Sequence, residues 1–351
     1  MANETKLDAG AESKIAQLAF SSISIHGLVS DSAQNDIPIT LSRSLSFPSN
    51  RTSFAPHRPF DGEEGWDSLP LPTQGLHLEL ALDERLGDGR IGLIYAAHVT
   101  RVLDHPGGVE IIDSVVNSTT QICVKLAKPL HCRSLAREAW FYERLPEEQG
   151  YQGVIVPKCY GLFSAAKNTL SATLGEELTI KPWGEGDVDA PLGYSEGSTE
   201  ENTGDFLPDD WEKLGFMSDG RRSKVDSPWN KWRASPDAPL VCVLLMERLG
   251  NIYSEDFSEC HPDSRMEIAD LIDDLSSAAI MHRDFKFNNI LRAPCASSQL
   301  CPRHRYAHGW RIIDFDRSTK WAKSVEVDTR RIPRYLREAF LDGTEFFWGS
   351  C

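Results

Sequence analysis

The sequence lacks both a long apolar segment and an excess of positive charge. No apolar run in the 351 residues approaches the roughly 20 residues that a membrane-spanning helix needs. The start, MANETKLDAGAESK, lacks the basic flank and apolar centre of a secretory signal. With 52 acidic against 37 basic residues, the formal charge is -15, which repels nucleic-acid backbones. These absences predict an intracellular protein, cytoplasmic or nuclear, that binds neither membranes nor nucleic acid.

The cysteines lack the spacing of a disulfide framework. All 8 are scattered, and several lie in apolar runs such as LVCVLL, where a thiol behaves as a small core residue. We expect them to be reduced. One group, Cys295, Cys301, His304 and His308, has spacings that can gather four ligands around zinc. Because its cysteine pair is not a CxxC motif, unrelated loop residues are the preferred interpretation.

Composition divides the chain into segments of different character. Residues 1–70 are rich in Ser, Asn and Pro and predict a mobile arm, with a weak apolar patch over 15–29 that can form a short helix. Residues 164–239 are rich in Gly, Pro, Ser, Asp and Glu and predict an irregular acidic insert. Parts of the insert are expected to dock, because it carries the large apolar rings of Trp183, Trp211, Trp229 and Trp232.

The remaining segments have regular hydrophobic patterns. Alternation over 76–82, followed by a glycine turn and the apolar run LIYAAHV, predicts a hairpin. Helical spacing of apolar residues predicts amphipathic helices. The expected elements are further strands at 121–126 and 240–246 and helices at 134–145, 262–277 and 334–341.

The segment His282-Arg283-Asp284-Phe285-Lys286-Phe287-Asn288-Asn289 carries the strongest chemical signal. Phosphoryl transfer needs a carboxylate to orient the attacking hydroxyl, a cation near the moving phosphate and a neutral oxygen ligand for Mg²⁺. Asp284, Lys286 and Asn289 supply these groups in that order. Downstream, Asp314 follows an apolar strand and is the second candidate Mg²⁺ ligand, with Asp316 as an extra carboxylate nearby.

Two upstream features suit the binding of a nucleotide. Gly87, Gly89 and Gly92 lie between two expected strands, where glycines let backbone amides approach phosphate oxygens. Taken by itself, this segment is better explained as an ordinary hairpin turn. Lys125 closes the strand Ile122-Cys123-Val124-Lys125, and the expected helix that follows carries two acidic candidates for its ion pair, Glu138 and Glu143.

In this order the segments resemble the protein-kinase-like superfamily, in particular compact fungal kinase-like proteins with a truncated C-terminal lobe. The resemblance implies an α+β, two-lobed fold with a small sheet-rich N-lobe, residues 71–246, and a shortened helical C-lobe, residues 247–351. It implies that Lys125 binds the α- and β-phosphates of ATP, that Glu138 holds this lysine, and that Met246 belongs to the hinge. It also implies that Asp284 and Lys286 are catalytic and that Asn289 and Asp314 bind Mg²⁺.

Two departures qualify what the resemblance implies. Asp316 stands where glycine is usual, and no Ala-Pro-Glu signature follows Asp314. The expected activity is transfer of the ATP γ-phosphate to a hydroxyl acceptor, with Ser or Thr of a protein favoured over a small molecule. The alternative is a pseudokinase that binds nucleotide or protein without turnover. The identity of the acceptor and the oligomeric state are not indicated by the sequence.

Overall fold

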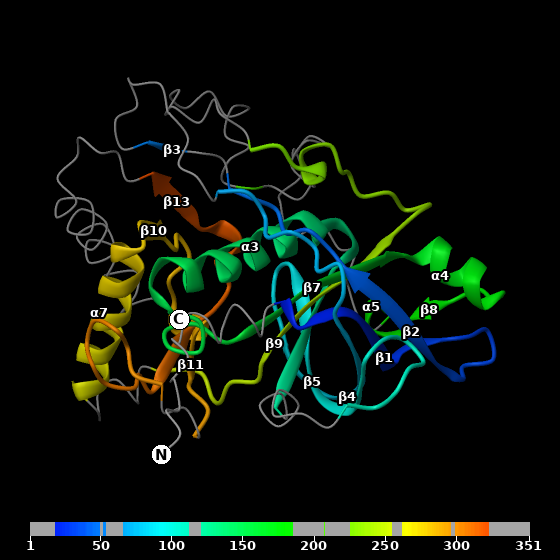
Figure 1. Ribbon diagram of the computed structural model, residues 1–351, viewed down its shortest axis with the longest axis horizontal. Helices are drawn as coiled ribbons and strands as arrows, with labels where there is room; N and C mark the ends of the chain where they lie inside the picture. Colours follow the sequence, from blue (N-terminus) through cyan, green and yellow to red (C-terminus); the bar gives the residue numbers. More distant parts are fainter. Residues whose placement is uncertain are drawn as a thin grey trace, which may run out of the picture.

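The computed structural model describes residues 18–49, 52–53, 66–111, 121–184, 207, 225–254, 262–295 and 299–322. Strands dominate this part of the chain (Figure 1). The α-helices wholly within it are α3 (Cys132–Gln149), α4 (Lys167–Leu174), α5 (Lys181–Gly184) and α7 (Pro262–Ser277). None of the described helices combines the length and the apolar character that crossing a membrane requires.

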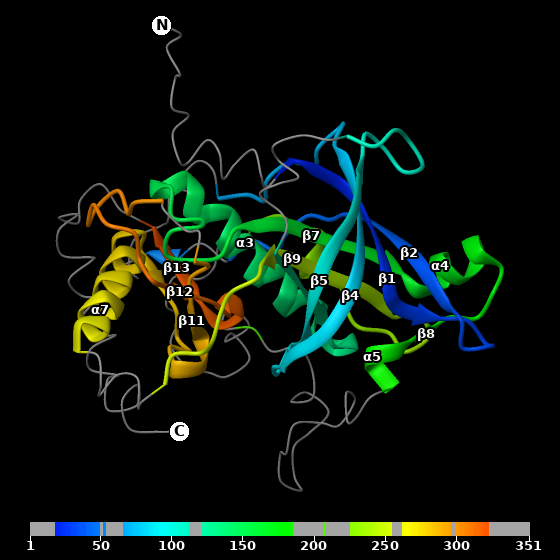
Figure 2. The same ribbon diagram turned by 90° about the horizontal axis from the view of Figure 1, so that it is seen from below.

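The main sheet closes on itself. Its ring consists of β1 (Phe20–Ser30), β2 (Asp36–Arg43), β4 (Leu76–Asp88), β5 (Gly92–Leu103), β6 (Ile122–Ala127), β7 (Cys159–Ala166) and β9 (Leu240–Glu247). The strand order is β2-β7-β9-β6-β5-β4-β1, and β1 then pairs with β2. The β1–β4 pair is parallel, and β8 (Thr179–Ile180) adds a short antiparallel pairing to β1. The result is a closed barrel in which the ring strands leave no free edge (Figure 2).

This closed barrel of seven strands shows that the predicted two-lobed α+β fold is wrong, and with it the assignment to the protein-kinase-like superfamily. The strands that close the sheet come from residues 20–43, which the composition assigned to a mobile arm. Their apolar residues alternate with Ser and Thr, and Ile23, Ile25, Ile39 and Leu41 are buried inside the barrel. The expected helical C-lobe contributes only α7 among its described α-helices.

Several local predictions agree with the structure. The hairpin is formed by β4 and β5, and the strands expected at 121–126 and 240–246 are β6 and β9. The helices expected at 134–145 and 262–277 are α3 and α7. The expected helix at 334–341 lies outside the described residues, as does Trp211. The domain boundaries at 71 and 247 stay a prediction.

The expected insert contains ordered parts. Residues 164–166 complete β7, and α4, β8, α5 and the 3-10 helix η4 (Pro228–Asn230) follow in the described portion. The indole of Trp183 donates a hydrogen bond of 3.2 Å to the carbonyl of Ala127. The indole of Trp229 donates one of 2.7 Å to the carbonyl of Leu45. These two rings therefore dock on the barrel strand β6 and on the segment after β2.

Two apolar clusters lie on the two faces of the barrel wall. On β6, Val124 belongs to the interior cluster and Cys123 to the cluster between the barrel, α3 and α7. On β9, Val243 and Leu244 divide in the same way, which explains why β9 is a continuous apolar run. Because successive side chains on a strand point to opposite faces, Lys125 lies on the outer face, toward α3.

The C-terminal segments lie at one end of the barrel, beyond α3 (Figure 1, Figure 2). Within them β10 (Ile280–Met281) pairs with β13 (Thr319–Ala322), and β11 (Ile290–Arg292) pairs with β12 (Trp310–Ile312). A short strand from the N-terminal part of the chain, β3 (Thr52–Ser53), adds to the other side of β13. The 3-10 helices η1 (Pro129–His131), η5 (Phe287–Asn289) and η6 (Phe315–Arg317) complete the elements. Pairing of Ile290 with Ile312 brings the 282–289 loop beside Asp314.

Candidate active site

Lys125 is a buried cation held between two carboxylates. Its Nζ lies 2.7 Å from Oε2 of Glu138 and 2.7 Å from Oδ1 of Asp314. The lysine comes from β6, the glutamate comes from α3, and the aspartate lies two residues after the end of β12. The side chain of Glu138 is only 1% exposed, whereas that of Asp314 is 28% exposed. Solvent therefore reaches this group of charges from the side of Asp314.

Burial and charge act in opposite directions on these groups. Burial lowers the pKa of Lys125, but Asp314 and Glu138 outweigh it and hold this pKa above its ordinary value. Burial raises the pKa of Asp314, but the Lys125 ammonium outweighs it and lowers that pKa below its ordinary value. Burial dominates at Glu138 and raises its pKa to about 7 despite Lys125. The charged forms of Lys125 and Asp314 therefore stabilise each other, whereas burial opposes the charged form of Glu138.

The backbone at Asp314 is held in an unusual conformation. Its φ of 69° and ψ of 61° lie in the left-handed region, which costs a non-glycine residue free energy. Its amide donates to the hydroxyl of Tyr142 over 3.4 Å, and that hydroxyl donates to Oε1 of Glu138 over 3.2 Å. Contacts from α3 therefore fix both the backbone of Asp314 and the carboxylate that holds Lys125.

The loop after β10 is bound to the segment that ends in Asp314. Nε2 of His282 lies 2.8 Å from the carbonyl of Ile313, whose amide donates to the carbonyl of Asn289 over 3.0 Å. Burial lowers the pKa of His282, so its ring is neutral and donates this bond. The side-chain amide of Asn289 donates to the carbonyl of Asp284 over 2.7 Å. Lys286 Nζ lies 2.7 Å from Oδ1 of Asp284, so the loop groups form one bonded set.

The tip of the β4–β5 hairpin reaches the same region. Gly87 pairs with Ile94, and the amide of Gly89 donates to the carbonyl of Gly92 over 2.9 Å. Within this tip, the guanidinium of Arg90 forms an ion pair with Asp316. Burial and the neighbouring Asp314 raise the pKa of Asp316 to about 6. The hairpin tip is thus anchored next to the Asp314 segment.

The three glycines of this tip differ in the space that a side chain would have at each position. A Cβ at Gly92 would lie 2.6 Å from the carbonyl oxygen of Leu126 on β6, so this position needs glycine for strand packing. At Gly87 and Gly89 the nearest atoms would lie 3.6 Å away, an ordinary contact, and neither residue has a left-handed φ. Packing therefore explains Gly92 and leaves Gly87 and Gly89 unexplained.

The structure thus brings together Lys125, Glu138 and Asp314, with the 282–289 loop hydrogen-bonded beside them. Glu143, the alternative partner for Lys125, lies elsewhere and accepts a hydrogen bond of 2.5 Å from the Ser46 hydroxyl. Met246, the residue expected in the hinge, lies within β9, where it is buried and paired with Cys123.

Sequence reasoning missed two contributors. Tyr142 falls at an apolar position of the helical spacing over 134–145, although its hydroxyl joins Asp314 to Glu138. Arg90 stood inside the glycine segment without a role, and the structure pairs it with Asp316. The sequence signal for Arg90 is weak: Asp316 is an extra carboxylate, and it requires a cation nearby only because the fold buries it.

No protein-family model matches the chain, and no curated protein matches it significantly.

Proposed function

We propose that the chain is an ATP- and Mg²⁺-dependent phosphotransferase that moves the γ-phosphate of ATP to a hydroxyl acceptor. The observation that carries this proposal is Lys125, whose ammonium lies 2.7 Å from both Glu138 and Asp314. A lysine fixed by one carboxylate beside a second, more exposed one suits a triphosphate that binds together with a divalent cation. The acidic composition does not favour a nucleic-acid partner, and the proposed setting is the cytoplasm.

The residues present fit Mg²⁺. This ion takes hard oxygen ligands, chiefly carboxylates and amide carbonyls. Asp314 offers a carboxylate, and Asn289 lies on the adjoining segment, where its backbone carbonyl accepts from Ile313 over 3.0 Å. The side-chain nitrogen of Asn289 is committed to the carbonyl of Asp284, so its carboxamide oxygen is the end that faces away from that bond. When bound, the metal would offset the negative charge of the phosphates.

The groups on the β4–β5 hairpin and β6 would bind the nucleotide. Lys125 offers its ammonium to phosphate oxygens, and Glu138 keeps it in place from α3. Gly87 and Gly89 place no side chain at the hairpin tip, which suits close approach of phosphate to the backbone and accounts for glycines that packing does not require.

The 282–289 loop would carry the transfer. Asp284 orients the acceptor hydroxyl and takes its proton as the acceptor oxygen bonds to the γ-phosphorus. The bond from the γ-phosphorus to the bridging oxygen breaks, and ADP leaves with the electron pair. Lys286 has a side chain 42% exposed and can turn from Asp284 toward the moving phosphate. A protein Ser or Thr is the favoured acceptor.

A nucleotide-binding module without turnover is the second candidate. The ion pair of 2.7 Å between Lys286 and Asp284 favours it, because this pair occupies the carboxylate that catalysis needs.

The test compares Mg²⁺-ATP binding, followed by thermal shift, with ATP turnover, using three variants. Asp314→Ala should weaken Mg²⁺-dependent binding and abolish turnover. Asp284→Asn should leave binding near wild type and lower the rate about a hundredfold or more. Asp237→Asn, a change at an exposed turn far from these groups in the chain, is the control and should match wild type. A folded wild type that shows no shift with saturating Mg²⁺-ATP would exclude both candidates, and a shift without turnover would leave the binding module.

A further inference from the structure

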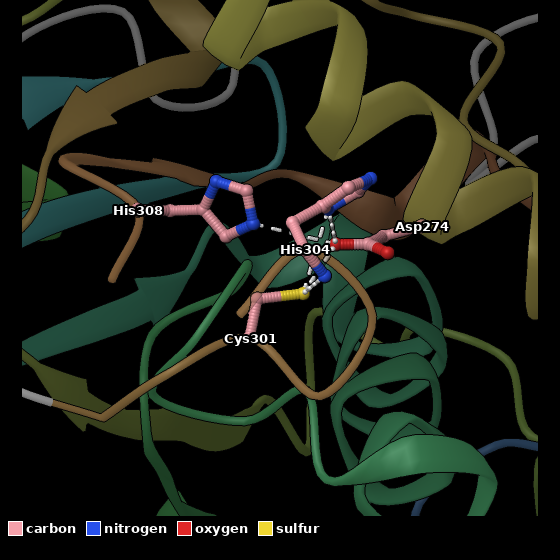
Figure 3. Close-up of side chains that lie close together, drawn as sticks. All are labelled: Asp274, Cys301, His304 and His308. Atoms are coloured by element: carbon pink, nitrogen blue, oxygen red, sulfur yellow. Dashed lines mark hydrogen bonds and ion pairs between the residues drawn. The ribbon is translucent and has the colours of Figure 1, made fainter. Parts of the chain in front are cut away.

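A second group of polar side chains lies where α7 meets the loop before β12. Asp274 comes from α7, and Cys301, His304 and His308 come from residues 299–309 (Figure 3). One ligand atom from each of the four lies within 4.8 Å of the others, and the four side chains point toward one another. Three of the four residues that the sequence analysis weighed as zinc ligands therefore lie together, against the preferred interpretation of unrelated loop residues, and an aspartate from a helix takes the place of Cys295.

We propose that Asp274, Cys301, His304 and His308 form a tetrahedral zinc site. Ligand bonds of about 2.0–2.3 Å place the four ligands of a tetrahedral Zn²⁺ about 3.3–3.6 Å apart. Oδ2 of Asp274 lies 3.1 Å from the Cys301 sulfur, 3.3 Å from Nδ1 of His304 and 3.5 Å from Nε2 of His308. The Cys301 sulfur lies 3.5 Å from Nδ1 of His304. These separations are close to the edges of such a tetrahedron.

The burial of Asp274 and His308 favours a bound cation between them. The side chains of Asp274 and His308 are 0% exposed. Neither ring nitrogen of His308 has a hydrogen-bond partner among the described residues, which is costly for a buried imidazole. The other oxygen of Asp274, Oδ1, accepts from the Tyr151 hydroxyl over 3.2 Å and lies 3.5 Å from Nε of Arg303. Oδ2 is thereby left facing the cluster.

The surroundings are those of a metal site. Metal-bound histidines commonly have a carboxylate at their second ring nitrogen. Nδ1 of His308 lies 3.8 Å from Oε1 of Glu267, and Nε2 of His304 lies 3.7 Å from Oδ1 of Asp270. Both carboxylates come from α7, as Asp274 does. The amide of His304 is also directed at the Cys301 sulfur over 3.4 Å, which stabilises a thiolate.

The ligand set selects the metal and its role. One sulfur, two imidazoles and one carboxylate are typical of Zn²⁺, whereas Mg²⁺ and Ca²⁺ take oxygen ligands only. A thiolate and a carboxylate balance the charge of Zn²⁺ without further groups. Because the protein fills all four positions, the site is structural. It joins the 299–309 loop to α7, which are the segments that lead into β12 and β10.

The test measures zinc in the untagged full-length protein, expressed with added zinc and then passed through a desalting column. We expect one zinc per chain in wild type. The two cysteines give a matched pair, because Cys295 is exposed and outside the cluster whereas Cys301 is buried within it. Cys295→Ser should keep the zinc, and Cys301→Ser and His308→Gln should lose most of it. Folded wild type without zinc, or equal loss in the two cysteine variants, would overturn the proposal.

A second measurement keeps the test decisive if the ligand variants fail to fold. Wild type and Cys295→Ser, stripped of metal with a chelator, are titrated with Co²⁺. Both should show tetrahedral cobalt absorption with a thiolate charge-transfer band, and zinc should abolish these bands. An octahedral spectrum, or a thiolate band lost in Cys295→Ser, would overturn the proposal. Neither measurement involves ATP, so its outcome is independent of the proposed function.

Discussion

Replacing Gly92 with alanine tests how closely β5 and β6 approach each other. The added Cβ would lie 2.6 Å from the carbonyl oxygen of Leu126, where 3.4 Å or more is an ordinary contact. Gly92 pairs with Ala127 and Leu93 with Leu126, so the two strands cannot separate here without disturbing the ladder. Overpacking of this kind costs about 1–3 kcal/mol. We expect Gly92→Ala to lower the free energy of unfolding by that amount.

Gly89→Ala is the matched variant. Its Cβ would meet nothing closer than 3.6 Å and its φ is not left-handed, so the free energy of unfolding should change by less than about 1 kcal/mol. Urea unfolding measures both variants, and thermal shift with Mg²⁺-ATP measures binding. Gly89→Ala should bind Mg²⁺-ATP more weakly while remaining stable. A Gly92→Ala protein as stable as wild type would refute the packing argument, and unchanged binding by Gly89→Ala would make the segment an ordinary turn.

Two other predictions test the charges and the barrel. Lys125→Met leaves Glu138 and Asp314 without the cation that they share. We expect this variant to lower the free energy of unfolding in urea by about 3–5 kcal/mol and to remove the thermal shift caused by Mg²⁺-ATP. A decrease in that free energy of less than about 1 kcal/mol would contradict the buried arrangement. Leu41→Ala should cost about 2–5 kcal/mol because Leu41 is buried inside the barrel, whereas Ser42→Ala on the exposed side should change stability by about 0.5 kcal/mol or less. Equal stability of these two variants would show that β2 does not close the barrel.

The sequence was informative wherever structure is set by neighbouring residues. The alternation in β4 and β5 and the helical spacing in α3 and α7 predicted these elements to within a few residues. From the sequence, the acidic partner of Lys125 could be limited to Glu138 or Glu143, and helix geometry distinguishes between these two residues. Five residues along a helix turn the chain through about 140°, so Glu143 faces away from the side that carries Glu138.

Barrel closure could not be read from local patterns. β1 pairs with β4 more than fifty residues away in sequence, as in Ile23 with Leu78, and such pairings depend on the whole sheet. Serine on the outward positions of β1 and β2 lowered the apolar content to that of a disordered segment, although the alternation with Ile25 and Ile39 was present. Because composition is averaged over a whole segment, it does not register this alternation, and the two strands were therefore not predicted.

Asp274 could not be identified as a ligand from sequence for a different reason. α7 also carries Glu267, Asp270 and Asp273, and nothing in the spacing distinguishes the one that faces Cys301. The sequence analysis grouped Cys301 with Cys295 as possible zinc ligands, but Cys295 is exposed. A metal site that draws on a helix and a loop appears only when the two are packed together.

The two faces of the barrel wall explain why the sequence predicted the contacts of Lys125 but not the fold. Lys125 points outward from β6 to α3, while its neighbour Val124 points into an apolar interior. The strands β1 and β2 complete that interior and contribute no polar group to the contacts around Lys125 that the structure describes. Motifs report groups that must meet on the outer face, and they carry no information on how the sheet closes behind it. The order of such motifs therefore predicts which polar groups meet, whereas the arrangement of the strands has to be established from other evidence.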